Sequence, residues 1–287
     1  MINHKSMVLA AALLMSSAAV WSAHHAEAVS GSAKLAAVLA AQSDEAKARY
    51  QFRHPQQTLD FFGLKEGMRV AEILPGGGWY TKILAPVVGE TGAIIGINYA
   101  DAMWPMFGMF DEATVAKRVA ASAQFGGMVA GFAGAEQVEA QGSAFGRLPE
   151  SLDASLDMVV IIRGLHNLNR FESKAGTMSA AMKQISTVLK PGGIVGVVQH
   201  RAPESAEDSW ADGSKGYLKQ SAVIALFEKG GFTMMASSDI NANPKDIPGA
   251  ADIVWRLPPT LATAPANKEA MAAIGESDRM TLKFQKN

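Results

Sequence analysis

The chain has 287 residues, of which 48% are hydrophobic and 18% are charged; its net charge is −1 and it has no cysteine. This near-neutral balance, without a basic cluster, argues against a nucleic-acid partner. The lack of cysteine excludes disulfides and thiolate chemistry. The length is sufficient for one large domain with a substantial core.

The first 28 residues have the pattern of a secretory signal peptide. After Lys5 comes an uncharged apolar run, residues 7–20, and then a small-residue cleavage site, Ala26-Glu27-Ala28. The apolar run is shorter than the roughly 20 residues that cross a membrane. We therefore expect cleavage after Ala28, a periplasmic or secreted mature protein and no stable membrane insertion. An uncleaved N-terminal anchor is the alternative.

Helical patterns fill the start of the mature chain. Residues 29–64 are expected to form an N-terminal helical extension with an alanine-rich helix over 32–50. A second helix is expected from Pro55 to Phe62, because proline is favoured in the first turn of a helix. The remaining residues, 65–287, are expected to form the main domain.

Strand and helix patterns alternate through the main domain. The hydrophobic spacing predicts strands at 69–74, 93–98, 137–140, 156–163, 194–200, 232–237 and 279–285, and helices at 79–88, 103–119, 171–189 and 215–229. Residues 126–134, rich in Gly and Ala, are expected to form a loop or a poorly formed helix. Strands that alternate with helices predict an α/β fold with a parallel sheet covered on both faces.

The most informative stretch is the turn after the first predicted strand. An apolar run, Val70–Leu74, leads directly into Pro75-Gly76-Gly77-Gly78 and then into a helix. A strand, a glycine turn and a helix bring backbone N–H groups close to a ligand. A tight turn without a ligand is the alternative, because short glycine motifs occur in many proteins.

Three motifs resemble those of class I S-adenosylmethionine-dependent methyltransferases. They are Glu72-x-x-x-Gly76-x-Gly78, the strand that begins Leu156-Asp157, and Leu189-Lys190-Pro191-Gly192-Gly193. The resemblance implies a doubly wound, mostly parallel, seven-stranded sheet with the last strand antiparallel. It also implies S-adenosyl-L-methionine as cofactor and a small-molecule substrate.

A narrower resemblance spans nearly the whole mature chain. Residues 75–81, the pattern Arg163-x-x-His166-Asn167 and residues 275–279 are similar to a group of predicted bacterial methyltransferases, many of which carry export signals. This group brings no established methyl acceptor with it.

The resemblance assigns seven residues to the cofactor: Glu72, Gly76, Gly77, Gly78, Asn98, Ser143 and Ala144. The glycines let the chain pass close under the methionine and sugar portions. Glu72 organises the ammonium end, or else bonds the N–H groups of its own turn, because a buried carboxylate needs partners. Asn98 stands where relatives have an acidic residue and takes the ribose hydroxyls. Ser143 and Ala144 are weak adenine contacts.

Candidate catalytic residues follow the next two strands. Arg163 and His166 come after the fourth strand, and His200 and Arg201 end the fifth. Ligands bind at the carboxyl ends of the strands in such sheets, so we expect these four side chains to face the cofactor turn. Either histidine can be a general base and Arg163 a clamp for an acidic substrate; a purely structural histidine is the alternative. No spacing typical of zinc ligands occurs, and we expect no metal.

The long connection at residues 241–277 leaves the carboxyl end of the sixth strand, so it is expected to lie over the same face. Asn241, Asn243, Trp255 and the Pro258-Pro259 turn can form a lid that selects the substrate. Long loops in compact domains often serve function. A surface excursion with only a packing role is the alternative.

Two functions from different classes remain open. The first is S-adenosylmethionine-dependent methyl transfer to an unidentified small molecule. The second is an exported, non-catalytic binding protein that retains the fold, because the cofactor is made in the cytoplasm and fold does not settle function. A dinucleotide-binding site fits less well, since Thr81 stands where the third glycine of that fingerprint belongs.

Overall fold

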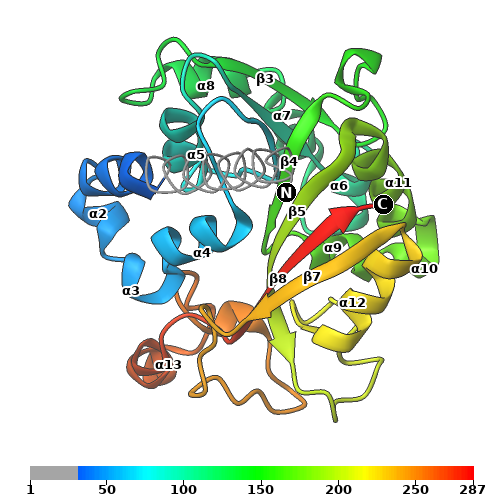
Figure 1. Cartoon of the computed structure of the whole chain (residues 1–287). Coiled ribbons are helices and arrows are strands. Elements are labelled where there is room, and N and C mark those ends of the chain that lie inside the picture. Colours follow the sequence, from blue (N-terminus) through cyan, green and yellow to red (C-terminus); the bar gives the residue numbers. More distant parts are fainter. Residues whose placement is uncertain (1–31) are drawn as a thin grey trace, which may run out of the picture.

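The computed structural model describes residues 32–287, and the predicted signal peptide lies outside the described residues. An eight-stranded sheet forms the centre, with strands in the order β3-β2-β1-β4-β5-β8-β7 and the short β6 beside β5 (Figure 1). Strand β8 is antiparallel to both of its neighbours, and the other pairs are parallel. The predicted doubly wound, mostly parallel sheet is confirmed, with β6 as an addition to the seven expected strands.

The strands of the sheet are β1 Arg69–Ile73, β2 Ala93–Asn98, β3 Glu139–Ala144, β4 Leu156–Ile162, β5 Leu189–Ala202, β6 Leu218–Lys219, β7 Phe232–Ser238 and β8 Arg279–Lys286. A helix at residues 32–40 is followed by α2 Asp44–Lys47, α3 Tyr50–Arg53, α4 Pro55–Phe62, α5 Thr81–Val88, α6 Met103–Met106, α7 Glu112–Ala120, α8 Phe125–Ala130, α9 Leu165–Arg170, α10 Glu172–Ala175, α11 Thr177–Val188, α12 Gln220–Lys229 and α13 Lys268–Ile274.

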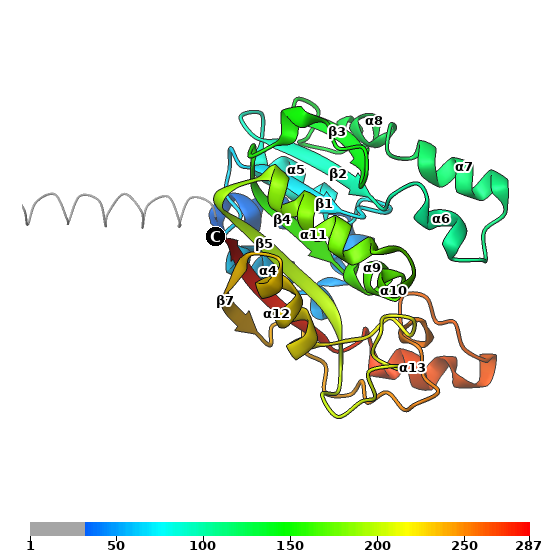
Figure 2. The same ribbon diagram turned by 90° about the vertical axis from the view of Figure 1, so that its right-hand side faces the viewer.

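Two apolar layers bury the sheet on both faces. Alternate residues of a strand point to opposite sides, so Val70 and Val160 pack in the layer of α4, α5 and α8. Ala71 and Val159 pack in the layer of α9, α11 and α12. Figure 2 shows α11 and α12 on the side opposite to α5. Burial on both faces explains why the central strands read as nearly continuous apolar runs.

Five predicted regions differ from the structure. The expected helix over 32–50 is divided into three, and that over 103–119 into α6 and α7, where Gly108 has φ 71°. The expected helix over 171–189 is divided into α10 and α11, and the one over 215–229 begins only at Gln220, after β6. Residues 126–134 are expected to form a loop or a poorly formed helix; residues 126–130 are helical, as part of α8, and residues 131–134 form turns. Phe125 and Val129 are buried against the sheet, and this packing outweighs the low helix propensity of glycine.

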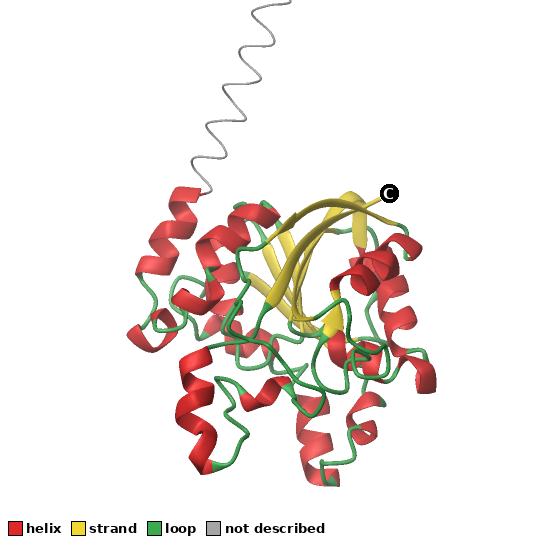
Figure 3. Cartoon of the chain, turned by 90° about the horizontal axis from the view of Figure 1, so that it is seen from below, coloured by secondary structure: helices red, strands yellow, loops and turns green. Residues whose placement is uncertain are grey.

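The carboxyl ends of the parallel strands lie together at the lower end of the sheet in Figure 1, and Figure 3 looks at this end from below. Loops and short helices cross this end, among them the 239–278 connection with α13. Within residues 32–287, no helix has both the length and the apolar character that a membrane span requires.

Candidate functional site

Two cavities flank the glycine turn. The larger, about 840 Å³, is lined by Arg163, His166 and His200. The smaller, about 520 Å³, is lined by Asn98, the last residue of β2, and by residues that follow β2. Residues 74–77 line both cavities, so a long ligand can lie across the turn with one part in each. This is the edge of the sheet at which the fold places ligands.

The turn has a left-handed backbone at several positions. Leu74, Gly76 and Gly78 have φ values of 54°, 57° and 76°; glycine adopts such angles at no steric cost, whereas leucine is strained there. A Cβ atom on Gly77 would have no atom within 4 Å, but one on Gly78 would lie 2.9 Å from the ring of Phe132. Gly76 and Gly77 therefore face the cavities, whereas position 78 must be glycine because a larger residue would collide with the Phe132 ring.

Glu72 is buried behind this turn. Its side chain is 4% exposed, and the Thr81 hydroxyl donates a hydrogen bond of 2.6 Å to its Oε2. Burial raises the pKa of Glu72 to about 8. Neither cavity has Glu72 in its lining. The carboxyl group thus ties β1 to the start of α5, as in the structural alternative, although its partner is a hydroxyl rather than an N–H group.

Glu72→Gln is expected to stabilise the protein increasingly as pH rises from 5 to 8. Glutamine keeps the oxygen that accepts from Thr81 and removes a charge that burial disfavours. The folded pKa, about 8, exceeds the unfolded value of about 4.3. Between these values the folded state holds a proton that the unfolded state has lost, so wild-type stability falls as pH rises.

One pKa unit corresponds to about 1.4 kcal/mol, and we expect a gain of at least that size at pH 8. Urea unfolding of both proteins at pH 5 and pH 8 measures it. Equal stabilities at pH 8 would contradict a neutral carboxyl group in the folded state.

Asn98 lines the smaller cavity, and its Nδ2 donates a 2.9 Å hydrogen bond to Ser122. The two expected adenine contacts do not reach this cavity: Ser143 donates to the Arg147 carbonyl at 3.1 Å, and Ala144 is fully buried. The cause is the segment before α8, which packs so closely on β3 that a Cβ atom on Gly142 would lie 1.8 Å from the Ser122 carbonyl oxygen. Residues of that segment line the cavity instead.

The two predicted catalytic histidines meet at the larger cavity. Their ring centroids are 5.5 Å apart, and His166 and His200 are 4% and 8% exposed. His200 Nδ1 lies 2.6 Å from Ser277 Oγ, and His166 Nδ1 lies 3.4 Å from Gln199 Oε1. Burial lowers the pKa of His166 to about 4 and that of His200 well below its usual range. Both imidazoles are therefore neutral near pH 7.

Arg201 does not join the histidines, contrary to expectation. Its Nε donates to Asp278 Oδ2 at 2.9 Å, and its Nη1 lies 3.0 Å from Asp239. Successive residues of a strand point to opposite faces, so Arg201 in β5 faces away from the side to which His200 points. In residues 32–287, no group of three or more His, Asp or Glu side chains is arranged to hold a metal ion.

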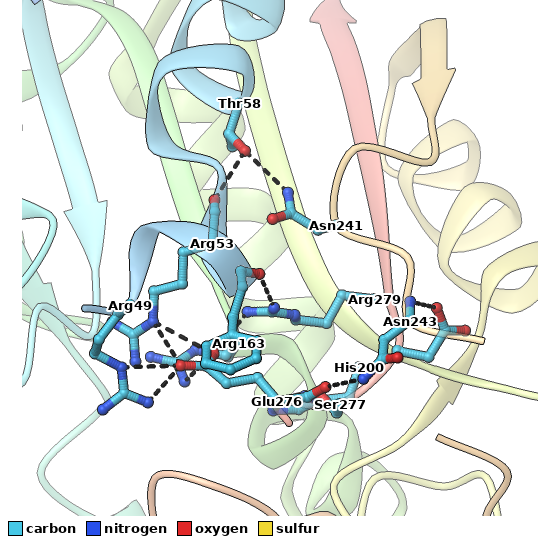
Figure 4. Close-up of polar contacts among 12 residues, drawn as sticks. Arg49, Arg53, Thr58, Arg163, His200, Asn241, Asn243, Glu276, Ser277 and Arg279 are labelled. Carbon is cyan, nitrogen blue, oxygen red and sulfur yellow. Dashed lines mark hydrogen bonds and ion pairs between the residues drawn. The ribbon is translucent and has the colours of Figure 1, made fainter. Parts of the chain in front are cut away.

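Four arginines gather around Glu276 (Figure 4). Three of them, Arg49, Arg53 and Arg163, line the larger cavity with Glu276, and Arg279 does not. Glu276 is 2% exposed. Arg49 and Arg53 donate from Nε to its Oε1 at 2.9 and 3.0 Å, and Arg279 donates from Nη1 to its Oε2 at 3.0 Å. Arg163 Nη1 is 3.8 Å from Oε2. We call these four arginines and Glu276 the arginine cluster.

Sequence reasoning missed most of the arginine cluster as a site. Only Arg163 was a candidate, and residues 275–279 entered only as part of a motif resemblance. Arg49 and Arg53 carried no signal beyond their positive charge in a helical segment. Asn167, part of the Arg163 motif, also lines the cavity, and its buried Oδ1 has no hydrogen-bond partner among the described residues.

The predicted lid divides into two parts. Trp255, Pro258 and Pro259 line the larger cavity, and the Trp255 ring lies 5.8 Å from that of His166. Asn241 and Asn243 serve the structure instead. Asn241 Nδ2 donates to the hydroxyls of Thr58 and Thr281 at 2.9 and 3.0 Å, and Asn243 Nδ2 donates to the Glu276 carbonyl at 2.6 Å.

Residues 51–106 match the family model of protein-L-isoaspartate(D-aspartate) O-methyltransferase. This segment contains β1, the glycine turn and β2. No curated protein sequence matches the chain.

Solved structures of methyltransferases resemble the fold at low sequence identity. An S-adenosylmethionine-dependent methyltransferase from Aquifex aeolicus is 14% identical over 88% of this chain and 98% of that protein, with a TM-score of 0.48. An arsenic(III) S-adenosylmethionine methyltransferase from Chlamydomonas reinhardtii is 15% identical over 88% and 72%, with a TM-score of 0.45. Human N-acetylserotonin methyltransferase, solved with S-adenosylmethionine, is 14% identical over 82% and 52%, with a TM-score of 0.44. The sheet order and the family match together support a methyltransferase that uses S-adenosylmethionine.

Proposed function

We propose that this protein transfers the methyl group of S-adenosylmethionine to a small molecule in the larger cavity. The observation that carries the proposal is the turn at residues 74–77, which lines both cavities. In this arrangement the smaller cavity would hold the adenosine portion, and Asn98 would bind its ribose hydroxyls. Gly76 and Gly77 would hold the methionine portion, and His166 would lie on the side of the larger cavity where the acceptor binds.

Methyl transfer needs mainly an in-line arrangement of the nucleophile, the methyl carbon and the sulfur. A bond forms between the acceptor atom and the methyl carbon as the carbon–sulfur bond breaks, and the electron pair of that bond remains on sulfur in S-adenosylhomocysteine. An acceptor hydroxyl or amine must also lose a proton. The neutral imidazole of His166 is in the form that accepts a proton, and the Trp255 ring lies edge-on beside it.

Gly77→Val is expected to weaken binding of S-adenosylhomocysteine at least tenfold, about 1.4 kcal/mol, while the protein stays folded. The valine side chain would occupy open space at the turn. Calorimetric titration and thermal melting of the same preparation measure both effects. Gly127→Val is the matched control, because a Cβ atom there also has no atom within 4 Å and Gly127 lines neither cavity.

Unchanged affinity in Gly77→Val would refute the proposed position of the cofactor. Affinity without methyl transfer to any acceptor would favour the non-catalytic binding protein. Gly78→Val is a poor probe, because its φ of 76° and the nearby Phe132 ring make it unfold the turn whether or not a ligand binds there.

We also propose that the protein is exported and belongs with the exported bacterial methyltransferases that its motifs resemble. The signal-peptide pattern supports this proposal. Protein recovered from its native host is expected to begin at Val29. N-terminal sequencing tests this, and a mature chain that begins at Met1 would overturn the proposal.

A further inference from the structure

The arginine cluster holds more positive charge than its one carboxylate can balance. Four guanidinium groups, from Arg49, Arg53, Arg163 and Arg279, surround Glu276, which leaves an excess of three positive charges. Arg53, Arg279 and Glu276 are almost completely buried. Buried charges are unfavourable unless they are paired. The wall of the larger cavity is therefore built to meet further negative charge.

Arg163 is the member of the cluster with the fewest partners. Its contact of 3.8 Å with Glu276 is longer than a hydrogen bond, because Arg49, Arg53 and Arg279 already donate to both oxygens of that carboxylate. Its guanidinium donates no hydrogen bond to any residue in the described part of the chain, and 26% of its side chain is exposed.

The backbone of Arg163 is strained. Its φ of 60° lies in the left-handed region, which a residue with a side chain adopts at a cost. The Arg163 N–H nevertheless donates a 2.7 Å hydrogen bond to the Val198 carbonyl, which fixes this conformation at the end of β4. Strain of this kind is found where function requires one orientation of a side chain.

One further hydrogen-bond donor in the lining of the larger cavity, the buried indole N–H of Trp79, lacks a partner among the described residues. The Arg53 guanidinium stacks over the Trp79 ring, 4.4 Å from its centre, and this cation–π contact orients the guanidinium. Both side chains line the cavity. Of the lining residues within 32–287, the only charged ones outside the arginine cluster are Lys82 and Glu45, whose charges are opposite and cancel.

The pKa values of these arginines are consistent with the excess charge. Burial, together with repulsion from Arg163, lowers the pKa of Arg53 to about 10. Burial also lowers the pKa of Arg163 and Arg279. A bound anion would relieve the repulsion among these groups.

We infer that Arg49, Arg53 and Arg163 form an oxyanion site that binds a carboxylate or phosphate group of a ligand in the larger cavity. Guanidinium groups bind such anions through paired, charge-assisted hydrogen bonds. Two sources present this chemistry there: the carboxylate of S-adenosylmethionine and an acidic methyl acceptor. The assignment to either source rests on the proposed function, whereas the oxyanion site itself does not.

The site is tested by calorimetric titration of the purified protein with inorganic phosphate, at low and high sodium chloride. Binding to the wild type is expected to weaken at least tenfold in Arg163→Gln and to weaken with salt. Arg163→Lys, which keeps the charge but not the planar fork, is expected to be intermediate. Arg69→Gln is the matched control, because Arg69 pairs with Glu139 on the surface; its phosphate affinity should equal that of the wild type.

A second set of titrations identifies the source of the anion. S-adenosylhomocysteine is compared with 5′-methylthioadenosine, which lacks the amino-acid portion. If Arg163→Gln weakens only S-adenosylhomocysteine, the cofactor carboxylate occupies the site. The other outcome has two parts: phosphate still binds to the wild type in saturating S-adenosylhomocysteine, and Arg163→Gln loses phosphate binding but keeps its affinity for S-adenosylhomocysteine. An acidic acceptor then occupies the oxyanion site.

The inference fails if Arg163→Gln leaves the affinities for phosphate and S-adenosylhomocysteine unchanged while the variant melts cooperatively. The proposed function fails separately, if the wild type binds neither adenosine ligand; Arg163-dependent phosphate binding would then still support the oxyanion site. Phosphate should also raise the melting temperature of the wild type more than that of Arg163→Gln.

Discussion

Replacing Glu276 with glutamine is expected to destabilise the folded protein by about 3–5 kcal/mol, as found when one partner of a buried ion pair is removed. The substitution removes the one negative charge that Arg53 and Arg279 contact. These arginines cannot turn to water, because each is less than 5% exposed. The variant therefore buries charges that repel one another without a counter-charge.

Urea unfolding at pH 7 measures this loss. Glu139→Gln is the matched control, because Glu139 pairs with Arg69 at the surface, where such pairs contribute about 0–1 kcal/mol. Phosphate is expected to restore part of the stability of Glu276→Gln by supplying an anion to Arg53 and its neighbours Arg49 and Arg163, which line the larger cavity. Similar losses in the two variants would show that the arginine cluster is not a buried charge network.

His166→Gln is expected to lower the rate of methyl transfer about 10²–10⁴-fold, the usual contribution of a general base. Glutamine preserves a polar side chain beside Gln199 but cannot exchange a proton at neutral pH. Transfer is measured with S-adenosylmethionine labelled in its methyl group and a panel of small acidic acceptors. Binding of S-adenosylhomocysteine is expected to be unchanged, because the histidine acts on the acceptor.

The pH dependence gives a second readout for His166. If the base were a histidine with an unperturbed pKa, the rate would fall as pH decreases through about 6.5. Burial lowers the pKa of His166 to about 4, so the wild-type rate is expected to stay level from pH 8 down to about 5. A lower melting temperature in His166→Gln with full turnover per folded molecule would make this histidine structural and His200 the next candidate.

Local sequence determined the framework of this protein. The pattern of apolar residues predicted seven of the eight strands found in residues 32–287, with ends within five residues of those observed, and it missed the short β6. The bounds of β2, Ala93–Asn98, match the prediction. Pro55 marked the start of α4, and the glycine motif marked the turn between the two cavities. These features follow from the backbone angles and burial that each short segment demands, so neighbouring residues are sufficient to reveal them.

Only the tertiary structure decided which side chains meet at the site. Arg49 and Glu276 are 227 residues apart in sequence yet hydrogen-bonded, and no periodicity within either segment predicts this pair. The motif made Glu72 a candidate for binding the cofactor, but its carboxyl group lies behind the turn and accepts a hydrogen bond from Thr81. The pleat of β1 sets the direction of this side chain. Side-chain direction and long-range pairing depend on how the layers pack, and a local pattern does not contain that information.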